Sequence, residues 1–269
     1  MSQTTLFERA EECIKACKPA EKIKLSYETE TAWQEKKLSL DKISAILKFE
    51  EPGRPDKPEL VPPRELNRRK ITTKEGHAAL IHSICHIEFN AINLAWDAVY
   101  RFQDMPVEFY ADWIKVAKEE AFHYELLSQH LNSLGYEYGD FSAHNGLWES
   151  ALLTAFDPMV RMALVPRVLE ARGLDVTPGI VNKLKGIGDQ AAIDILAIVH
   201  RDEIGHVEIG TRWFRYLCEQ RGLNSEKIFK ELIDKYMKGT LRGPFDHDAR
   251  KRAGFTEEEL IYLESTNLN

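Results

Sequence analysis

The sequence predicts an all-α protein, in which four long helices form a bundle and further helical segments lie at both ends. Apolar residues recur at helical spacing from about residue 73 to residue 222, and the alternating pattern of strands is nearly absent there. A chain of 269 residues can also bury a sizeable core. We therefore expect a helical and proline-rich extension over 1–72, the bundle over 73–222, and a helical extension over 223–269 that packs on the bundle.

The N-terminal extension divides into two parts. Residues 1–50 predict short helices broken near Pro19. The stretch 51–63, EPGRPDKPELVPP, holds five of the eleven prolines, so it can form neither a helix nor a central strand and is expected to run extended across a surface. A basic cluster follows, which is either a solvated face or a site for an anion or substrate: Arg64, Arg68, Arg69 and Lys70.

The predicted bundle contains four amphipathic segments. They span about 73–102, 106–134, 148–172 and 189–221. Pro106 suits the first turn of the second helix, and the third helix is expected to end before Gly173, with a kink or break caused by Pro158 and Pro166. About twenty residues rich in Gly, Asp, Ser and Asn join the second segment to the third, which indicates one long connection. One or two helices are expected after the bundle, separated by 241–248.

Ionisable side chains interrupt the apolar stripes of all four segments. Burying an isolated carboxylate costs several kcal/mol unless it is paired or bound to metal. The spacing Glu-x-x-His places both side chains on one helical face, one turn apart, where both can reach one metal centre. The stripe positions in question are Glu88, then Glu120 and His123, then Glu170, then Glu203 and His206.

The Glu-x-x-His motif occurs twice, and each copy follows another glutamate on a stripe at nearly the same distance. Glu88 precedes Glu120 by 32 positions, and Glu170 precedes Glu203 by 33. Two antiparallel helix pairs related by a pseudo-twofold axis produce such a repeat. The pattern predicts a dinuclear metal site; the alternative is a bundle whose buried glutamates and histidines satisfy one another.

With all six positions filled, the sequence resembles the ferritin-like superfamily of di-iron and di-manganese carboxylate proteins. Four stretches also look like a bacterial ferritin-like family catalogued as a domain of unknown function: PGRP, RMALVPRVLEARGLDVTP, HRDEIGHV and LRGPFDHDARKRAGF. That closer resemblance covers about residues 40–265 and implies the ferritin-like fold. The resemblance to the superfamily implies that Glu120 and Glu203 bridge two ions, with Glu88 and Glu170 as terminal ligands and one histidine on each ion.

The cofactor implied is a pair of iron ions, with Mn/Fe and Mn/Mn as alternatives, because hard carboxylates with only two imidazoles suit iron or manganese. The first functional hypothesis is an enzyme that uses O2 and an electron donor to oxidise or hydroxylate a small organic substrate. The second is a ferroxidase, iron-handling or peroxide-scavenging protein. The third is a helical binding module with structural metal. The extensions look like covers for a substrate pocket and favour the first hypothesis, but the sequence names no substrate.

For several neighbours of the motif residues, the sequence allows more than one role. The residues that either support the ligands or pack as core are His200, Asp202, Asp97, Tyr124 and Trp96. Arg167 and Arg172 bracket Glu170 and are expected in surface salt bridges, with anion binding as the alternative. Glu119 and Glu125 are expected to be solvated. His82 and His86 are not expected to be ligands.

Composition limits the other classes of function. A net charge of -7 and a pI near 5.8 argue against strong, non-specific nucleic-acid binding, although the basic cluster keeps a modified tRNA base among the candidate substrates. The four cysteines form neither a disulfide framework nor a zinc ribbon. No secretory apolar region and no apolar run of 18 residues stand in the sequence, so we expect a cytoplasmic protein outside the membrane. The sequence leaves the oligomeric state open.

Overall fold

The computed structural model describes residues 4–237 and 241–266, and it is all-helical there, as predicted. Two isolated bridges, Thr5 with Ser39 and Leu60 with Ala143, are the β-type pairings among these residues. No helix in these two ranges combines the length and apolarity that a membrane span requires. The chain divides into two compact units, unit 1 (Met1–Leu152) and unit 2 (Leu153–Asn269). This boundary falls inside the predicted bundle segment, 73–222, and the predicted extension 223–269 includes residues outside the described ranges.

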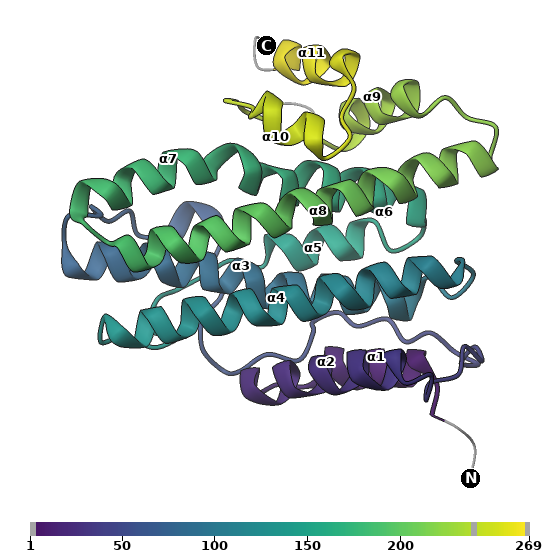
Figure 1. Cartoon of the computed structure of the whole chain (residues 1–269), viewed down its shortest axis with the longest axis horizontal. Helices are drawn as coiled ribbons and strands as arrows, with labels where there is room; N and C mark the ends of the chain where they lie inside the picture. Colours follow the sequence, from purple (N-terminus) through teal and green to yellow (C-terminus); the bar gives the residue numbers. More distant parts are fainter. Residues whose placement is uncertain (1–3, 238–240, 267–269) are drawn as a thin grey trace. The chain divides into compact units, whose positions relative to one another are not determined.

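Unit 1 is built on a pair of long antiparallel helices, which Figure 1 draws in blue and teal. They are α3 (Lys74–Arg101) and α4 (Val107–Ser133), and they pack against each other along their lengths. The Thr73 side chain caps α3 by accepting from the Gly76 amide, and Gly135, with φ 83°, follows the end of α4. The first two predicted bundle helices are therefore confirmed to within one or two residues, with Pro106 at the N-cap of α4.

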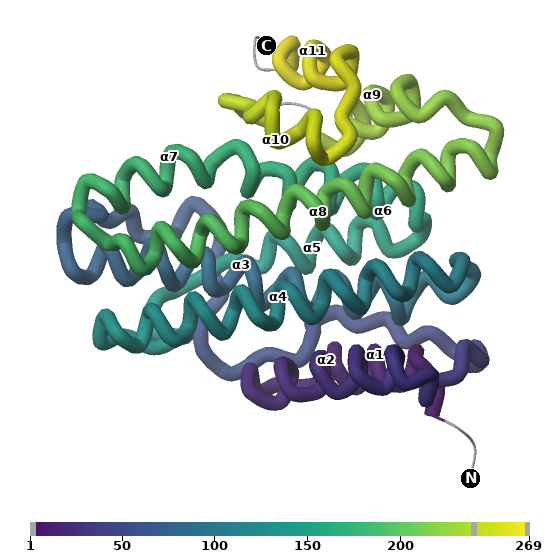
Figure 2. The backbone as a smooth tube through the Cα atoms, in the orientation of Figure 1, coloured from purple at the N-terminus to yellow at the C-terminus, as the bar shows by residue number. Residues whose placement is uncertain are grey.

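Two shorter helices and a long irregular segment complete this unit. Helix α1 (Leu6–Lys15) packs on α3, and α2 (Pro19–Gln34) packs on α4, with the predicted break before Pro19. Helices α1 and α2 also lie against each other (Figure 2). From residue 35 to residue 73 the chain is irregular, apart from the short 3-10 turn η1 (Pro63–Glu65). Backbone hydrogen bonds at Glu59 and Val61 join this segment to Ala143, just before α5 (Gly146–Leu153). The prediction of a non-helical proline-rich stretch is confirmed.

Unit 2 contains a second antiparallel pair. One member is the continuous run of α6 (Pro158–Leu164), the π-helix η2 (Val165–Glu170) and α7 (Ala171–Ile187). The other member is α8 (Gln190–Gln220), which packs on all three. Gly188, with φ 77°, makes the tight connection, and Gly222, with φ 64°, follows the end of α8.

The third predicted segment is confirmed in its break at Pro158 and wrong in its end. The chain breaks at residues 154–157, where Asp157 caps a new helix that begins with Pro158, and the helical run then continues through Gly173 and Pro178 to Ile187. Burial of Leu174 and Leu184 against the rest of unit 2 outweighs the low helix propensity of the glycine and the proline.

The C-terminal region has more helices than the one or two predicted. Within the part of the chain that the structure describes, they are α9 (Ser225–Tyr236), α10 (His247–Arg252) and α11 (Glu257–Thr266). Asp246 caps α10 by accepting from the Ala249 amide, so this six-residue helix begins at His247, inside the predicted connection 241–248.

Candidate metal centre

Three of the predicted ligands meet in the interior of unit 1. Glu88 comes from α3, and Glu120 and His123 come from α4; all three are at most 3% exposed. His123 Nδ1 lies 3.2 Å from Glu88 Oε2 and 3.6 Å from Glu120 Oε2. One ligand atom from each residue lies within 4.8 Å of the others, a spacing that can hold a metal ion. We call Glu88, Glu120 and His123 the unit 1 cluster.

The electrostatics of the unit 1 cluster are those of charges crowded in a dry interior. Burial and the nearby Glu120 carboxylate raise the pKa of Glu88 to about 8. Burial alone lowers the pKa of His123, but hydrogen bonds and charge from Glu120 and Glu88 outweigh it and raise the pKa to about 11. The metal-free cluster therefore retains protons that compensate the carboxylate charge, and a bound cation can supply the same compensation.

Unit 2 holds the second Glu-x-x-His pair on α8. His206 Nδ1 lies 3.6 Å from Glu203 Oε1, the same separation as between His123 and Glu120. His206 is fully buried, whereas the Glu203 side chain is 12% exposed. Among the residues described, Glu203 Oε2 is buried and has no hydrogen-bond partner. A buried carboxylate oxygen of this kind is satisfied well by a cation.

Glu170, the remaining predicted ligand, lies at the last position of the π-helix η2 and is partly exposed. A π-helix adds a residue to one turn and thereby changes which side chains share a face; such segments are frequent at functional sites. The sequence predicted a kink near Pro166, and η2 contains that proline. We call Glu170, Glu203 and His206 the unit 2 set.

Arg167, which also lies on η2, contradicts the prediction of a surface salt bridge. It is fully buried and forms an ion pair with Glu259 at 2.7 Å. Its guanidinium group lies 4.0 Å from the centre of the Phe229 ring and 4.6 Å from that of Phe255. The partners belong to α9, α11 and the turn before α11, so no local pattern could reveal them. Arg172 is partly exposed and pairs with Asp175 at 3.6 Å.

The aromatic and acidic neighbours of the unit 1 cluster mainly join helices. Trp96 Nε1 donates to Ser26 Oγ of α2 at 2.9 Å, which is a core role. Tyr124 is buried between Phe89 and Tyr138, and burial raises its pKa. Asp97 is buried and pairs with Arg101 at 2.6 Å.

The remaining predictions divide between surface and interior. Glu119 pairs with Lys115 at 2.6 Å on the surface, as expected, whereas Glu125 was wrongly predicted to be solvated, because it accepts a hydrogen bond from Tyr27 of α2. Asp202 accepts hydrogen bonds from its neighbour Arg201. His200 Nε2 is buried without a hydrogen-bond partner among the described residues, and its supporting role stays a prediction.

His82 and His86 are bound away from the unit 1 cluster, which agrees with the prediction that they are not ligands. His82 Nε2 accepts from the Gly139 amide at 2.9 Å. His86 Nδ1 lies 2.9 Å from the Tyr138 hydroxyl, and its Nε2 lies 3.1 Å from the carbonyl oxygen of His144. Both rings thus fix the loop that follows α4.

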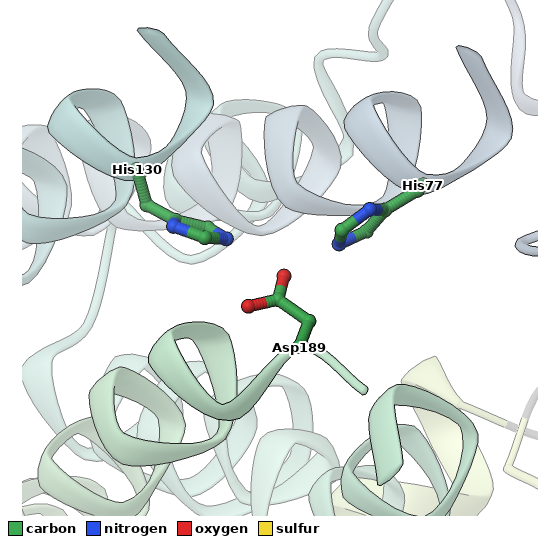
Figure 3. Close-up of side chains that lie close together, drawn as sticks. All are labelled: His77, His130 and Asp189. Atoms are coloured by element: carbon green, nitrogen blue, oxygen red, sulfur yellow. The ribbon is translucent and has the colours of Figure 1, made fainter. Parts of the chain in front are cut away.

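Two further histidines of unit 1, His77 and His130, were not identified from the sequence. Figure 3 shows their rings directed toward each other from α3 and α4, with ring centres 6.3 Å apart. The figure also labels Asp189, the N-cap of α8, which accepts from the Ala192 amide at 2.9 Å. A signal was present, because His130 follows His123 by two helical turns and therefore lies on nearly the same face.

The fold and the unit 1 cluster define an all-helical protein with buried carboxylate and imidazole groups that can hold a metal ion. The family described as "Protein of unknown function (DUF455)" matches residues 15–261, and the chain belongs to that family. A relative described as an uncharacterized protein of Haemophilus influenzae is 51% identical over 216 residues, which cover 78% of this chain and 75% of the relative. No solved structure matches the chain.

Proposed function

We propose that the chain is a non-haem dinuclear metal oxidoreductase, with iron as the favoured metal, that uses O2 to oxidise or hydroxylate a small organic substrate. One observation carries the proposal. The same Glu-x-x-His pair, with the same 3.6 Å separation, stands in the interior of unit 1 and again on α8 of unit 2. A single buried pair is compatible with mutual neutralisation; a repeated pair with an additional glutamate in each unit is typical of a dinuclear carboxylate site.

The donor groups fit such a pair of ions. The six groups are four carboxylates and two imidazoles, without thiolate, which favours iron or manganese. In this proposal the two ions would be held by Glu88, Glu170, His123 and His206, and Glu120 and Glu203 would be shared between them. A divalent cation would offset the burial and the repulsion from Glu120 that raise the pKa of Glu88, and it would satisfy the buried Oε2 of Glu203.

The proposal requires the unit 1 cluster and the unit 2 set to join in one ferritin-like bundle. The two helix pairs, α3 with α4 and the η2 run with α8, would then be related by the pseudo-twofold axis that the sequence repeat predicts. Each pair places a lone glutamate on one helix and the Glu-x-x-His motif on the other, so the two halves have equivalent connectivity.

Bound iron would supply the electrons for the activation of O2, and the chain would supply a dry and ordered setting. Buried apolar residues stand one or two helical turns from these ligands on α3 and α4: Ile81, Ile84, Ile92, Ala117, Leu127. These side chains would exclude water from a reactive site. Glu88 would orient His123 through the 3.2 Å contact with Nδ1, and His123 must release its proton on metal binding.

Metal content provides the first test. We expect about two iron or manganese ions per chain, and we expect Glu120→Ala and Glu203→Ala each to lose the pair, because each removes a bridge. Matched controls are Glu119→Ala on α4 and Glu208→Ala on α8, whose side chains are 26% and 47% exposed and pair with lysine or arginine. Mass spectrometry of metals in the purified variants measures the outcome. Equal metal loss from controls and ligand variants would contradict the ligand assignment.

Reaction with O2 distinguishes the functional classes. The protein is loaded with Fe(II) without oxygen and then mixed rapidly with O2 while optical spectra are recorded. A transient absorbance that decays faster with an added organic substrate would support the oxidoreductase. Accumulation of iron mineral would favour iron handling, and no reaction at all would favour a structural metal; both of these outcomes contradict the proposal.

A further inference from the structure

Unit 1 has a surface pocket that the metal ligands do not line. Its volume is about 420 Å³, within the range of pockets that hold small organic ligands. The wall comes from the outward face of α3, from residues 66–69 after the proline-rich stretch, and from residues 141–144 before α5. His86 lines this pocket, whereas Glu88, two positions further along α3, belongs to the unit 1 cluster, because residues two apart on a helix face different ways.

The pocket is held open by contacts between its own walls. Both ring nitrogens of His86 are engaged, one by Tyr138 and the other by the carbonyl of His144, so the loop is fixed to α3. Gly76 lets the backbone of Lys70 approach α3, because a Cβ at position 76 would collide with the Lys70 carbonyl. A pocket with fixed walls loses less entropy when a ligand binds.

Apolar side chains line much of the pocket. They include Leu66, Leu80, Ile87, Phe141 and Leu147. Ile87 is 48% exposed, although it stands on a helix whose other apolar residues are mostly buried. An exposed isoleucine that faces a pocket gains free energy when an apolar ligand covers it. The pocket therefore suits a ligand with an apolar body.

The pocket lining also carries a positive charge and a hydrogen-bond donor, from Arg69 and His144. The Arg69 guanidinium lies 5.1 Å from the centre of the Phe141 ring, and its Nε donates to Glu75 at 3.0 Å. Among the described residues, Glu75 is the ion-pair partner of Arg69, and it binds Nε. The two terminal nitrogens of the guanidinium group can therefore donate to a ligand. His144 Nδ1 accepts from the Gly146 amide, so the proton of a neutral ring lies on Nε2, which can donate.

The charge around Arg69 favours an anion with a single charge. Residues 64–75 contain five basic and two acidic residues in a chain of net charge -7. Among the described residues, Arg69 is the one arginine or lysine that lines the pocket, and Glu75 pairs with it and would repel a dianion. These features match a carboxylate, which accepts two hydrogen bonds from one guanidinium group, better than a phosphate.

We propose that this pocket binds a small amphipathic carboxylate, with its apolar body against Leu80 and Ile87 and its carboxylate on Arg69. The basic cluster was expected to be either a solvated face or an anion site. In this proposal Arg69 belongs to a ligand site, and Arg64 belongs to a solvated face. Binding here does not require the metal pair, so the proposal is independent of the proposed function.

The test is calorimetric titration of the metal-free full chain with octanoate as the probe. We expect Arg69→Gln to weaken octanoate binding at least about tenfold, because a charge-assisted hydrogen bond is lost. Arg64→Gln is the matched control from the same segment; its side chain is 85% exposed, and we expect less than about a twofold change. Glu75→Gln should strengthen binding by releasing Arg69. Ser83→Trp, on an exposed position that lines the pocket, should block binding without a change in charge.

Two further probes complete the test: an uncharged alcohol and an anion that has no apolar part. Octan-1-ol should bind more weakly than octanoate and should respond little to Arg69→Gln, and inorganic phosphate should not displace octanoate. Circular dichroism confirms that each variant is folded. The proposal is overturned if octanoate does not bind, if Arg64→Gln weakens binding as much as Arg69→Gln, or if phosphate competes on equal terms.

Discussion

The two Glu-x-x-His pairs have the same local geometry and different surroundings. In unit 1 the pair stands on α4, and its partner α3 is an uninterrupted helix of 28 residues. In unit 2 the pair stands on α8, and the partner run contains the π-helix η2 with Glu170 at its end. The motif fixes the separation of its own glutamate and histidine, but it does not determine how the third ligand is presented.

The charges next to the two sets also differ. Beside Glu170, Arg167 is fully buried and depends on an ion pair with Glu259, 92 positions further along the chain. In unit 1, the buried basic groups on the turns before Glu88 are His82 and His86, and burial lowers the pKa of each to about 4. Unit 2 thus uses a buried ion pair where unit 1 uses neutral imidazoles. The ion pair of unit 2 should be sensitive to loss of its arginine, and the neutral imidazoles of unit 1 should be sensitive to acid.

The largest effect is expected from Arg167→Met. The substitution leaves Glu259 buried without its cation and removes the guanidinium from the rings of Phe229 and Phe255. We expect the free energy of unfolding to fall by about 3–5 kcal/mol, the cost of breaking a buried pair. Urea unfolding followed by circular dichroism measures the change.

Two companion variants sharpen this prediction. Arg172→Met changes an arginine that is 40% exposed and stands five positions after Arg167. We expect the free energy of unfolding to change by less than about 0.5 kcal/mol. The double variant Arg167→Met with Glu259→Leu should recover part of the loss, because no unpaired charge remains. If Arg167→Met alone unfolds no more easily than Arg172→Met, the buried ion pair is not what stabilises this part of unit 2.

The contrast between the units also explains how far the sequence was informative. The ends of α3 and α8 were predictable because local signals mark them: Thr73 caps α3, and Gly222 follows α8. The burial of Glu88 and Glu120 followed from their place on an apolar stripe. These features were predicted well because each depends on a local cap signal or on the regular periodicity of one helix.

The failures lie where distant residues decide the local structure. Arg167 looked like a surface residue because its partners, Glu259 and Phe255, come from the C-terminal region. The helical run through Gly173 depends on packing that local propensity does not encode. The joining of the two ligand sets into one centre stays a prediction, as does the metal itself.

A smaller effect on the free energy of unfolding is expected when the pH is lowered, because His82 of unit 1 is buried as a neutral ring. Burial, followed by repulsion from His86, lowers the pKa of His82 from 6.5 to about 4, so the folded state favours the neutral ring. The stability that this provides is present above pH 6.5 and is lost as the pH falls from 6.5 toward 4, because the unfolded chain binds the proton first. We expect His82→Gln, which keeps an acceptor for the Gly139 amide, to reduce the acid-induced loss by up to about 3 kcal/mol.

Tryptophan fluorescence during urea unfolding at pH 4, 5 and 6.5 measures this loss in the metal-free protein, because four of the five tryptophans lie in unit 1. His86→Gln should act in the same direction, since burial also lowers the pKa of His86. Parallel curves of stability against pH for the wild type and His82→Gln would show that His82 is not the acid-sensitive group.

The smallest effect is expected from a substitution at Gly210, where α8 packs against the π-helix η2. A Cβ at Gly210 would overlap the ring of Pro166, the proline of η2, whereas a Cβ at Gly205 on the same helix meets no atom within 4 Å. We expect Gly210→Ala to lower the free energy of unfolding by about 1–2 kcal/mol through overpacking, and Gly205→Ala to raise it by up to about 1 kcal/mol through helix propensity. Urea unfolding of the two variants gives the comparison. Equal shifts of the same sign would mean that Gly210 is not needed for the close approach of Pro166, and that η2 owes its shape to the sequence around Pro166 rather than to α8.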